Sequence, residues 1–299
     1  MSQETDPLLT PLPSIPIQSR KQTRYSLITT HLATPISPQK TPYLLIFCYM
    51  ITGLLDSSAI TTWGSFVSMQ TGNTVYLGLG LAQALSGQGN YSHNYNGGDD
   101  GKNNQRWLKS LLSIASFCVG SCFFGLLHYR AFRCPRARGA LVASFLVQMG
   151  CLGIAAGVVT ARLVSFGGGQ GIGGEELDYR VAVPLALVAF QSAGQAVLSR
   201  VVGTRGLTSV VLTSVYCDLF LGLAVPGERH GVEEWRRVGA ILGLLVGTLM
   251  GGLWARVLRE AGLAGALWMA VVLKGGIVVA WLVWRGEDLD ADGGGDGDE

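Results

Sequence analysis

Apolar residues recur in long blocks along most of the chain, separated by polar or glycine-rich stretches. Each block is about 20 residues long, enough for a helix rising about 1.5 Å per residue to cross the ~30 Å hydrocarbon core of a bilayer. The eight blocks are residues 43–64, 65–85, 108–129, 139–161, 181–199, 206–225, 237–258 and 263–284. The pattern predicts an all-α polytopic membrane protein with six to eight membrane segments.

Composition agrees with a membrane protein. Hydrophobic residues make up 48% of the 299 residues and charged residues only 14%, with a mean hydropathy of +0.36. Soluble domains carry about 25% charged residues. The net charge of +2 indicates no nucleic acid as a partner. The expected partners are the lipid bilayer and an unknown small solute.

The two ends of the chain have a different composition from its middle. Residues 1–41 are rich in Pro, Ser and Thr, which predicts a disordered cytosolic tail. The run from Glu4 to Leu9 resembles an acidic dileucine signal for sorting adaptors, and a merely solvated tail is the alternative. Residues 285–299 form a second, acidic tail. A transmembrane domain over 42–284 remains, in the plasma membrane or a vacuolar/endosomal membrane.

The most informative stretch is residues 53–82, which is almost free of charge but contains Asp56. A helix-weakening cluster follows that acid: Gln70, Thr71, Gly72, Asn73 and Thr74. An acid at membrane depth usually faces a bundle interior or a water-filled cavity, and a broken helix there must be satisfied by protein or line a cavity. We therefore expect the solute site here. Asp56 would carry charge or a proton, the cluster would supply ligands, and Gly72 would permit the break.

A second stretch repeats part of this pattern. Residues 71–82 align without gaps on residues 213–224, with identical residues at six positions that include Gly80 and Gly222. The chain therefore divides into halves of about 43–161 and 181–284. The second-half counterparts of the site would be Gln191, Gln195, Thr213 and Asp218. One re-entrant element per half would invert the halves, as in many transporters, whereas chance matching of Leu, Gly and Ala is the alternative.

Charge along the loops predicts the topology. The arginine-rich loop 130–138 is expected to be cytosolic, with Arg200 and Arg256 as weaker markers of the same side. A cytosolic N-terminal tail and a cytosolic 130–138 loop are compatible if segment 65–85 enters the membrane and returns to the outer side. The glycosylation sequon at Asn90 then also lies outside. The rival topology has eight full spans with both termini outside.

Four glycines form a ridge on the seventh segment at strict four-residue spacing: Gly239, Gly243, Gly247 and Gly251. Overlapping GxxxG motifs let another helix backbone approach closely. We expect the ridge to pack within the chain, and the oligomeric state stays open.

Lys274 lies near the middle of the last segment. An unpaired ammonium at that depth costs about 2.5–3.5 kcal/mol even on the lenient insertion scale. Asp56 and Asp218 are the available counter-charges, so we expect a buried ion pair of Lys274 with an aspartate. Either the pair is structural, or Asp56 is used for proton coupling.

The stretches Gly53-Leu54-Leu55-Asp56 and Phe66-Val67-Ser68-Met69-Gln70-Thr71-Gly72-Asn73 resemble the YoaK-like family, also called the domain of unknown function 1275. Phe190-Gln191-Ser192-Ala193 is similar to a second element of that family. The resemblance covers about 43–284 and implies a fungal-type member with a longer tail and loops than compact bacterial members. It implies an integral membrane protein of undetermined activity.

Two functional classes are left. The first is a secondary transporter or permease for a small solute, with a polar site near the membrane midplane. The second is a non-transporting scaffold or assembly factor that uses the glycine ridge and the tails. We do not expect an enzyme, because HExxH and GxSxG motifs do not occur, and no CxxC or Cys/His spacing points to a metal or cofactor.

Overall fold

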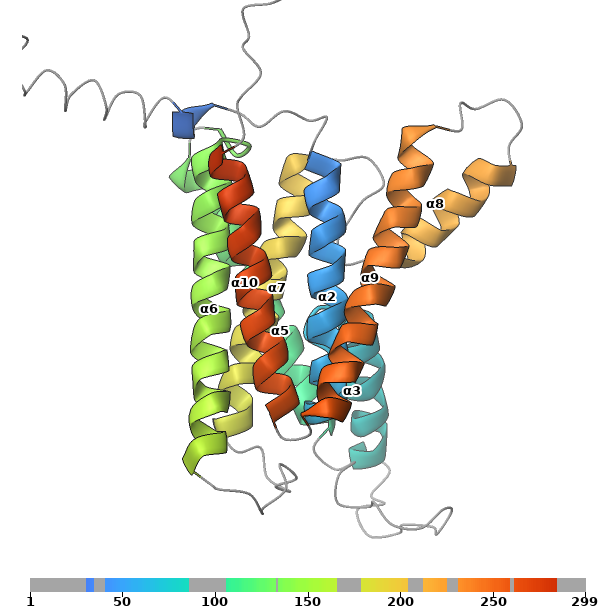
Figure 1. Ribbon diagram of the computed structural model, residues 1–299. Coiled ribbons are helices and arrows are strands. Elements are labelled where there is room, and N and C mark those ends of the chain that lie inside the picture. Colours follow the sequence, from blue (N-terminus) through green and yellow to red (C-terminus); the bar gives the residue numbers. More distant parts are fainter. Residues whose placement is uncertain are drawn as a thin grey trace, which may run out of the picture.

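The computed structural model describes residues 31–34, 41–85, 106–132, 134–165, 179–203, 212–224, 231–258 and 261–283. Their regular elements are helices, arranged as a bundle (Figure 1). These are α2 (Thr41–Trp63), α3 (Gln70–Leu85), α5 (Arg106–Leu126), the π-helical turn η1 (Leu127–Ala131), α6 (Arg138–Ser165), α7 (Tyr179–Val202), α8 (Leu212–Ala224), α9 (Val232–Val257) and α10 (Gly262–Val283). Residues 4–9, Asn90 and 285–299 lie outside this described part, as do residues 1–30 and 35–40 of the predicted N-terminal tail.

The predicted all-α polytopic class is confirmed. Six helical stretches are long and apolar enough to cross a membrane: Pro42–Trp63, Arg106–Ala131, Arg138–Ala161, Tyr179–Val202, Val232–Val257 and Gly262–Val283. The second and sixth predicted segments are shorter, because α3 has 16 residues and α8 has 13. At about 1.5 Å per residue these two helices reach only about 24 and 20 Å, less than the ~30 Å hydrocarbon core.

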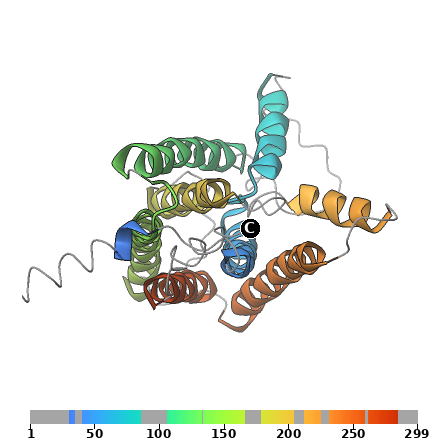
Figure 2. The same ribbon diagram turned by 90° about the horizontal axis from the view of Figure 1, so that it is seen from above.

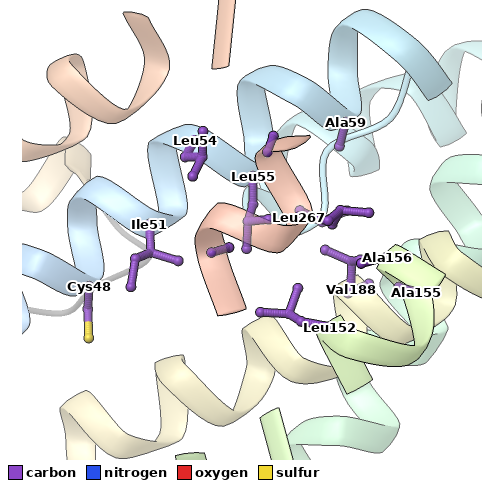
Figure 3. Packing of buried hydrophobic residues seen from close by; sticks show 14 of the residues in the cluster. Cys48, Ile51, Leu54, Leu55, Ala59, Leu152, Ala155, Ala156, Val188 and Leu267 are labelled. Carbon is purple, nitrogen blue, oxygen red and sulfur yellow. The ribbon is translucent and has the colours of Figure 1, made fainter. Parts of the chain in front are cut away.

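The arrangement centres on α2 (Figure 2), which together with α7 is the most buried of the spans. Apolar side chains of α2 meet those of α6, α7 and α10 in the core shown in Figure 3. They include Ile51 and Leu55 of α2, Leu152 of α6, and Leu267 of α10. Burial of this apolar face holds α2 in the middle of the bundle, and its polar residues Thr52 and Asp56 lie deep in the protein.

The glycine ridge of α9 packs against α2, within the chain as the sequence predicts. The two helices run parallel. A Cβ built on Gly243 would lie 3.0 Å from the Ile46 carbonyl oxygen, and one on Gly247 would overlap the Met50 carbonyl oxygen. On α2, a Cβ on Gly53 would overlap the Leu244 carbonyl oxygen. Because both partners at these points are main chain, neither helix can move aside by changing a rotamer.

A second close pair is α5 with α7. A Cβ on Gly120 of α5 would lie 2.5 Å from the Phe190 carbonyl oxygen of α7, and one on Gly194 would lie 2.7 Å from the Phe124 ring. Moving four residues along α5, from Gly120 to Phe124, moves the contact four residues along α7, from Phe190 to Gly194. The two helices are therefore parallel. The bundle therefore contains two glycine-packed pairs, α2 with α9 and α5 with α7.

The short helices α3 and α8 both begin at depth and run outward. In α3, Asn73 bonds to Ser113 of α5, and a Cβ on Gly80 would overlap Trp107 near the start of α5. The start of α8 packs beside Ala240 of α9, whereas its end approaches Arg237. In Figure 1, α3 leaves at the lower end of the bundle and α8 at the upper end.

One sequence-based topology marker is wrong. Arg138 begins α6 and Arg200 lies in the last turn of α7, and these two helix ends are at the top of Figure 1, where Arg136 also bonds to the Val201 carbonyl oxygen. Arg256 lies in the last turn of α9, which ends at the bottom of the figure. Arg256 could share the side of Arg138 and Arg200 only if 206–225 crossed the membrane, which the sequence left open. The 13-residue α8 does not cross, so α9 starts at the end where α7 finishes.

Candidate functional site

The predicted acid, Asp56, is buried and holds the connection between α2 and α3. Its Oδ1 accepts hydrogen bonds from the backbone N–H groups of Val67 and Ser68, each at 2.9 Å, and its Oδ2 accepts one from the Ser68 hydroxyl. Asp56 lies two turns before the end of α2, or about 10 Å along its axis. Residues 64–69, here called the re-entrant loop, therefore return into the bundle after α2 ends.

Asn73 holds the same loop from the other side. Its Oδ1 accepts bonds from the Phe66 N–H and the Ser65 hydroxyl, both at 3.0 Å. Its Nδ2 donates to the Phe66 carbonyl oxygen at 2.7 Å and to the Ser113 hydroxyl oxygen at 3.1 Å. One amide thus satisfies both backbone groups of Phe66, and its own burial is complete.

Three further groups complete the support of the re-entrant loop. Gln70 donates to the Val67 carbonyl oxygen at 3.0 Å, and the Ser113 hydroxyl donates to the Phe66 carbonyl oxygen at 2.7 Å. The loop begins at Gly64, whose φ of 74° lies in the left-handed region that glycine adopts readily. Arg106 donates to the Gly64 carbonyl oxygen at 2.7 Å. The protein itself satisfies this non-helical backbone, as membrane depth requires.

The predicted position of the helix break was wrong by a few residues. Gln70 to Thr74 form the first turn of α3, and the non-helical residues are the re-entrant loop before them. The N–H groups of a helix's first turn have no acceptor within the helix, so polar side chains are common there, and the polar cluster suits a helix start. Gly72 does not break the helix; a Cβ there would lie 2.8 Å from the Phe66 ring. Thr71 and Thr74 are exposed, and the Thr74 hydroxyl bonds to the Gln70 carbonyl oxygen.

Lys274 forms a second buried polar centre, among α6, α7 and α10. Its Nζ donates to Gln148 Oε1 at 2.5 Å and to Gln195 Oε1 at 3.1 Å, and lies 4.9 Å from the centroid of the Phe145 ring. The expected Lys274–aspartate pair is therefore wrong for the part of the chain described. Neutral amide oxygens hold the ammonium, whereas the Asp56 carboxylate is held by the re-entrant loop.

The two centres are connected through α2. Gln195 donates from Nε2 to the Cys48 carbonyl oxygen at 2.8 Å and to Thr52 Oγ1 at 2.7 Å. Thr52 and Asp56 are four residues apart, so they lie on one face of the helix in consecutive turns. We call the series Lys274, Gln195, Thr52 and Asp56 the polar track; it leads from the middle of α10 to the re-entrant loop.

The predicted second-half residues do not gather in one place. Gln195 belongs to the polar track, and Gln191 is buried nearby on α7 with its Nε2 bonded to Ser192 Oγ at 3.0 Å. Thr213 is exposed on α8, and Asp218 is half-buried there, with its backbone carbonyl oxygen accepting a bond from Arg237 at 3.2 Å.

Sequence reasoning missed several polar-site residues. Thr52, Ser65, Ser68, Ser113 and Gln148 are all buried and hydrogen-bonded. Gln148 could have been found, because it is an amide in the middle of an otherwise apolar segment. The serines carry little signal, since a serine in a membrane helix commonly bonds to its own backbone.

These features define a polytopic α-helical membrane protein with a re-entrant loop and buried polar centres. The family described as "Protein of unknown function (DUF1275)" matches residues 44–280, and the chain belongs to it. No curated protein and no solved structure matches the chain.

Proposed function

We propose that this protein is a secondary transporter or permease for a small solute, and that the polar track is part of its solute pathway. The observation that carries the proposal is the track itself, which places a buried ammonium, an amide, a hydroxyl and a buried carboxylate in series at membrane depth. Ionisable groups in membrane segments are costly and typically mark pathways for ions or solutes.

The order and direction of the helices support this proposal. The series α2, α3, α5, α6 corresponds to α7, α8, α9, α10 with the opposite direction, since α3 leaves at one end of the bundle and α8 at the other. The pair of α2 with α9 then corresponds to that of α7 with α5. Inverted repeats with interrupted helices are a plan of secondary transporters.

In this proposal Asp56 is a positioning residue. Its carboxylate accepts three bonds from the re-entrant loop, so its charge fixes where the loop backbone lies. A solute that passes the loop requires these bonds to exchange or break. Movement of the loop would thereby be linked to the charge state of Asp56.

The scaffold alternative loses one of the surfaces on which it was based, the glycine ridge, whereas the predicted tails lie mostly outside the described residues. The glycine ridge lies against α2, so it is not free to bind another protein. Gly243→Leu is expected to damage the protein under either function, so it does not separate the two classes.

Uptake by the reconstituted full-length protein tests the proposal. We expect proteoliposomes to accumulate at least one labelled compound from a panel of sugars, amino acids, organic acids and inorganic ions above protein-free vesicles. In Asp56→Asn the initial rate should fall at least about tenfold, because the loop loses its anionic acceptor.

The matched control is Gly252→Ala, since a Cβ on Gly252 meets nothing within 4 Å. This variant should transport like the wild type. Wild-type uptake by Asp56→Asn would remove the acid from the pathway, and vesicles that take up nothing across the whole panel would count against transport itself.

A further inference from the structure

The Lys274 centre, formed by Lys274, Gln148, Gln195 and Phe145, holds a positive charge with no balancing negative one among the described residues. Lys274 is completely buried, and its hydrogen-bond acceptors among the described residues are the two neutral amide oxygens. An ammonium has three N–H donors, so one is left to face the ring of Phe145. Amide dipoles and a ring face reduce the cost of burying this charge but do not neutralise it.

A second buried donor lies beside the same ring. Trp281 is seven residues after Lys274 on α10, hence on the same face of the helix, and only 1% of its surface is exposed. Its ring packs edge-on against Phe145, with centroids 4.6 Å apart and an interplanar angle of 81°. The indole Nε1–H is buried and has no hydrogen-bond acceptor in the described protein. An unpaired buried N–H is unfavourable until an acceptor reaches it.

These two features require the same kind of ligand. A cation would be repelled by Lys274, and a neutral solute would leave its charge unbalanced. A group with a negative charge and more than one acceptor oxygen would balance the ammonium and accept from the free donors. Asp56 does not fill this role, because its oxygens accept from Val67 and Ser68.

We propose that the Lys274 centre binds an anionic group, either a carboxylate of an organic acid or an inorganic oxyanion, with Lys274 and Trp281 as the donors. The inference rests on the proposed transport function in that the anion is taken to be the solute. Gln148 and Gln195 hold the ammonium in place from α6 and α7, and are positioning residues.

Binding to the purified full-length protein tests the inference without transport. The melting temperature is followed by circular dichroism while sodium acetate, L-lactate, nitrate or phosphate is titrated at constant pH and ionic strength against a bulky sulfonate. At least one anion should stabilise the wild type saturably, as a ligand of the folded state does. Replacing sodium with choline should leave the effect unchanged. A response to carboxylates alone indicates an organic acid, and a response to nitrate or phosphate alone an inorganic anion.

Two variants separate binding from structure. Lys274→Gln keeps a donor amide but removes the charge, and should weaken anion binding at least about tenfold. Trp281→Phe removes the unpaired N–H together with part of the buried ring system, so its melting temperature without anion is expected to fall by the cost of the smaller side chain. Its anion binding should also weaken severalfold relative to the wild type. A purely structural tryptophan would lower the melting temperature and leave the anion affinity unchanged.

Three results overturn the inference: no anion in the set stabilises the wild type, Lys274→Gln responds as the wild type does, or Trp281→Phe binds anions as tightly as the wild type. Its failure is distinct from failure of the proposed function. Uptake of a neutral or cationic solute without anion binding would keep the transporter and remove the anion site. Anion binding that depends on Lys274, without uptake of that anion, would keep the site and remove the transporter.

Discussion

Replacing Asp56 with leucine is expected to destabilise the protein by about 3–5 kcal/mol, among the largest effects of any single substitution in this chain. Leucine has a similar volume but no acceptor. The N–H groups of Val67 and Ser68 and the Ser68 hydroxyl would then lose their partner at membrane depth. The expected result is a fall of roughly 10 °C in the melting temperature of the detergent-purified protein.

Asp56→Asn is the matched control for this prediction. Its remaining oxygen can still accept from a loop N–H, and its amide can donate to the Ser68 hydroxyl, which is able to act as an acceptor. We expect less than half of the loss seen with leucine. Equal melting temperatures for the leucine variant and the wild type would show that the three bonds do not hold the re-entrant loop.

Gly247→Leu is the second substitution expected to have a large effect. Its Cβ would overlap the Met50 carbonyl oxygen and lie 2.9 Å from the Leu54 nitrogen. Because these are main-chain atoms inside the α2–α9 contact, the helices must separate, and other apolar contacts are lost with them. We expect a loss of about 3 kcal/mol or more, beyond ordinary overpacking, and little monodisperse protein on size-exclusion chromatography.

Gly252→Leu tests the same helix on its open side. No atom lies within 4 Å of a Cβ at this position, and leucine has a better helix propensity than glycine by up to about 1 kcal/mol. This variant should purify and melt like the wild type or slightly better. Similar behaviour of the two variants would contradict the assignment of the close contact to Gly247.

The sequence pattern was sufficient for the features that depend on one helix at a time. The apolar segments predict six to eight membrane segments, a range that includes the six spans found, and the four-residue spacing of Gly239 to Gly251 predicts close packing. The lone acid in an uncharged stretch correctly indicated that Asp56 is buried. Each of these follows from helix periodicity and the exclusion of charge from lipid.

Features that depend on which helices meet were not predictable in the same way. Gln148 and Gln195 are 126 and 79 residues from Lys274, so their contact follows only from the packing of α6, α7 and α10. The sequence predicts a carboxylate as the partner of Lys274, but the Asp56 carboxylate is bound by the re-entrant loop. The break was misplaced because glycine usually ends a helix, whereas Gly72 admits the ring of Phe66 into the first turn of α3.

The contacts within the two glycine-packed pairs differ in kind from the contacts between the pairs. Backbones approach closely over several turns in the pair of α2 with α9, and at Gly120 in the pair of α5 with α7, so each pair tends to move as a rigid body. Between the pairs, the Gln195 amide reaches Thr52, and Asp56 reaches a loop that Asn73 and Ser113 tie to α5. Hydrogen bonds of this sort can be exchanged for bonds to water or solute one at a time. If the protein carries a solute as proposed, a rocking of one pair against the other would exchange these bonds while the apolar contacts of α2 with α7 slide.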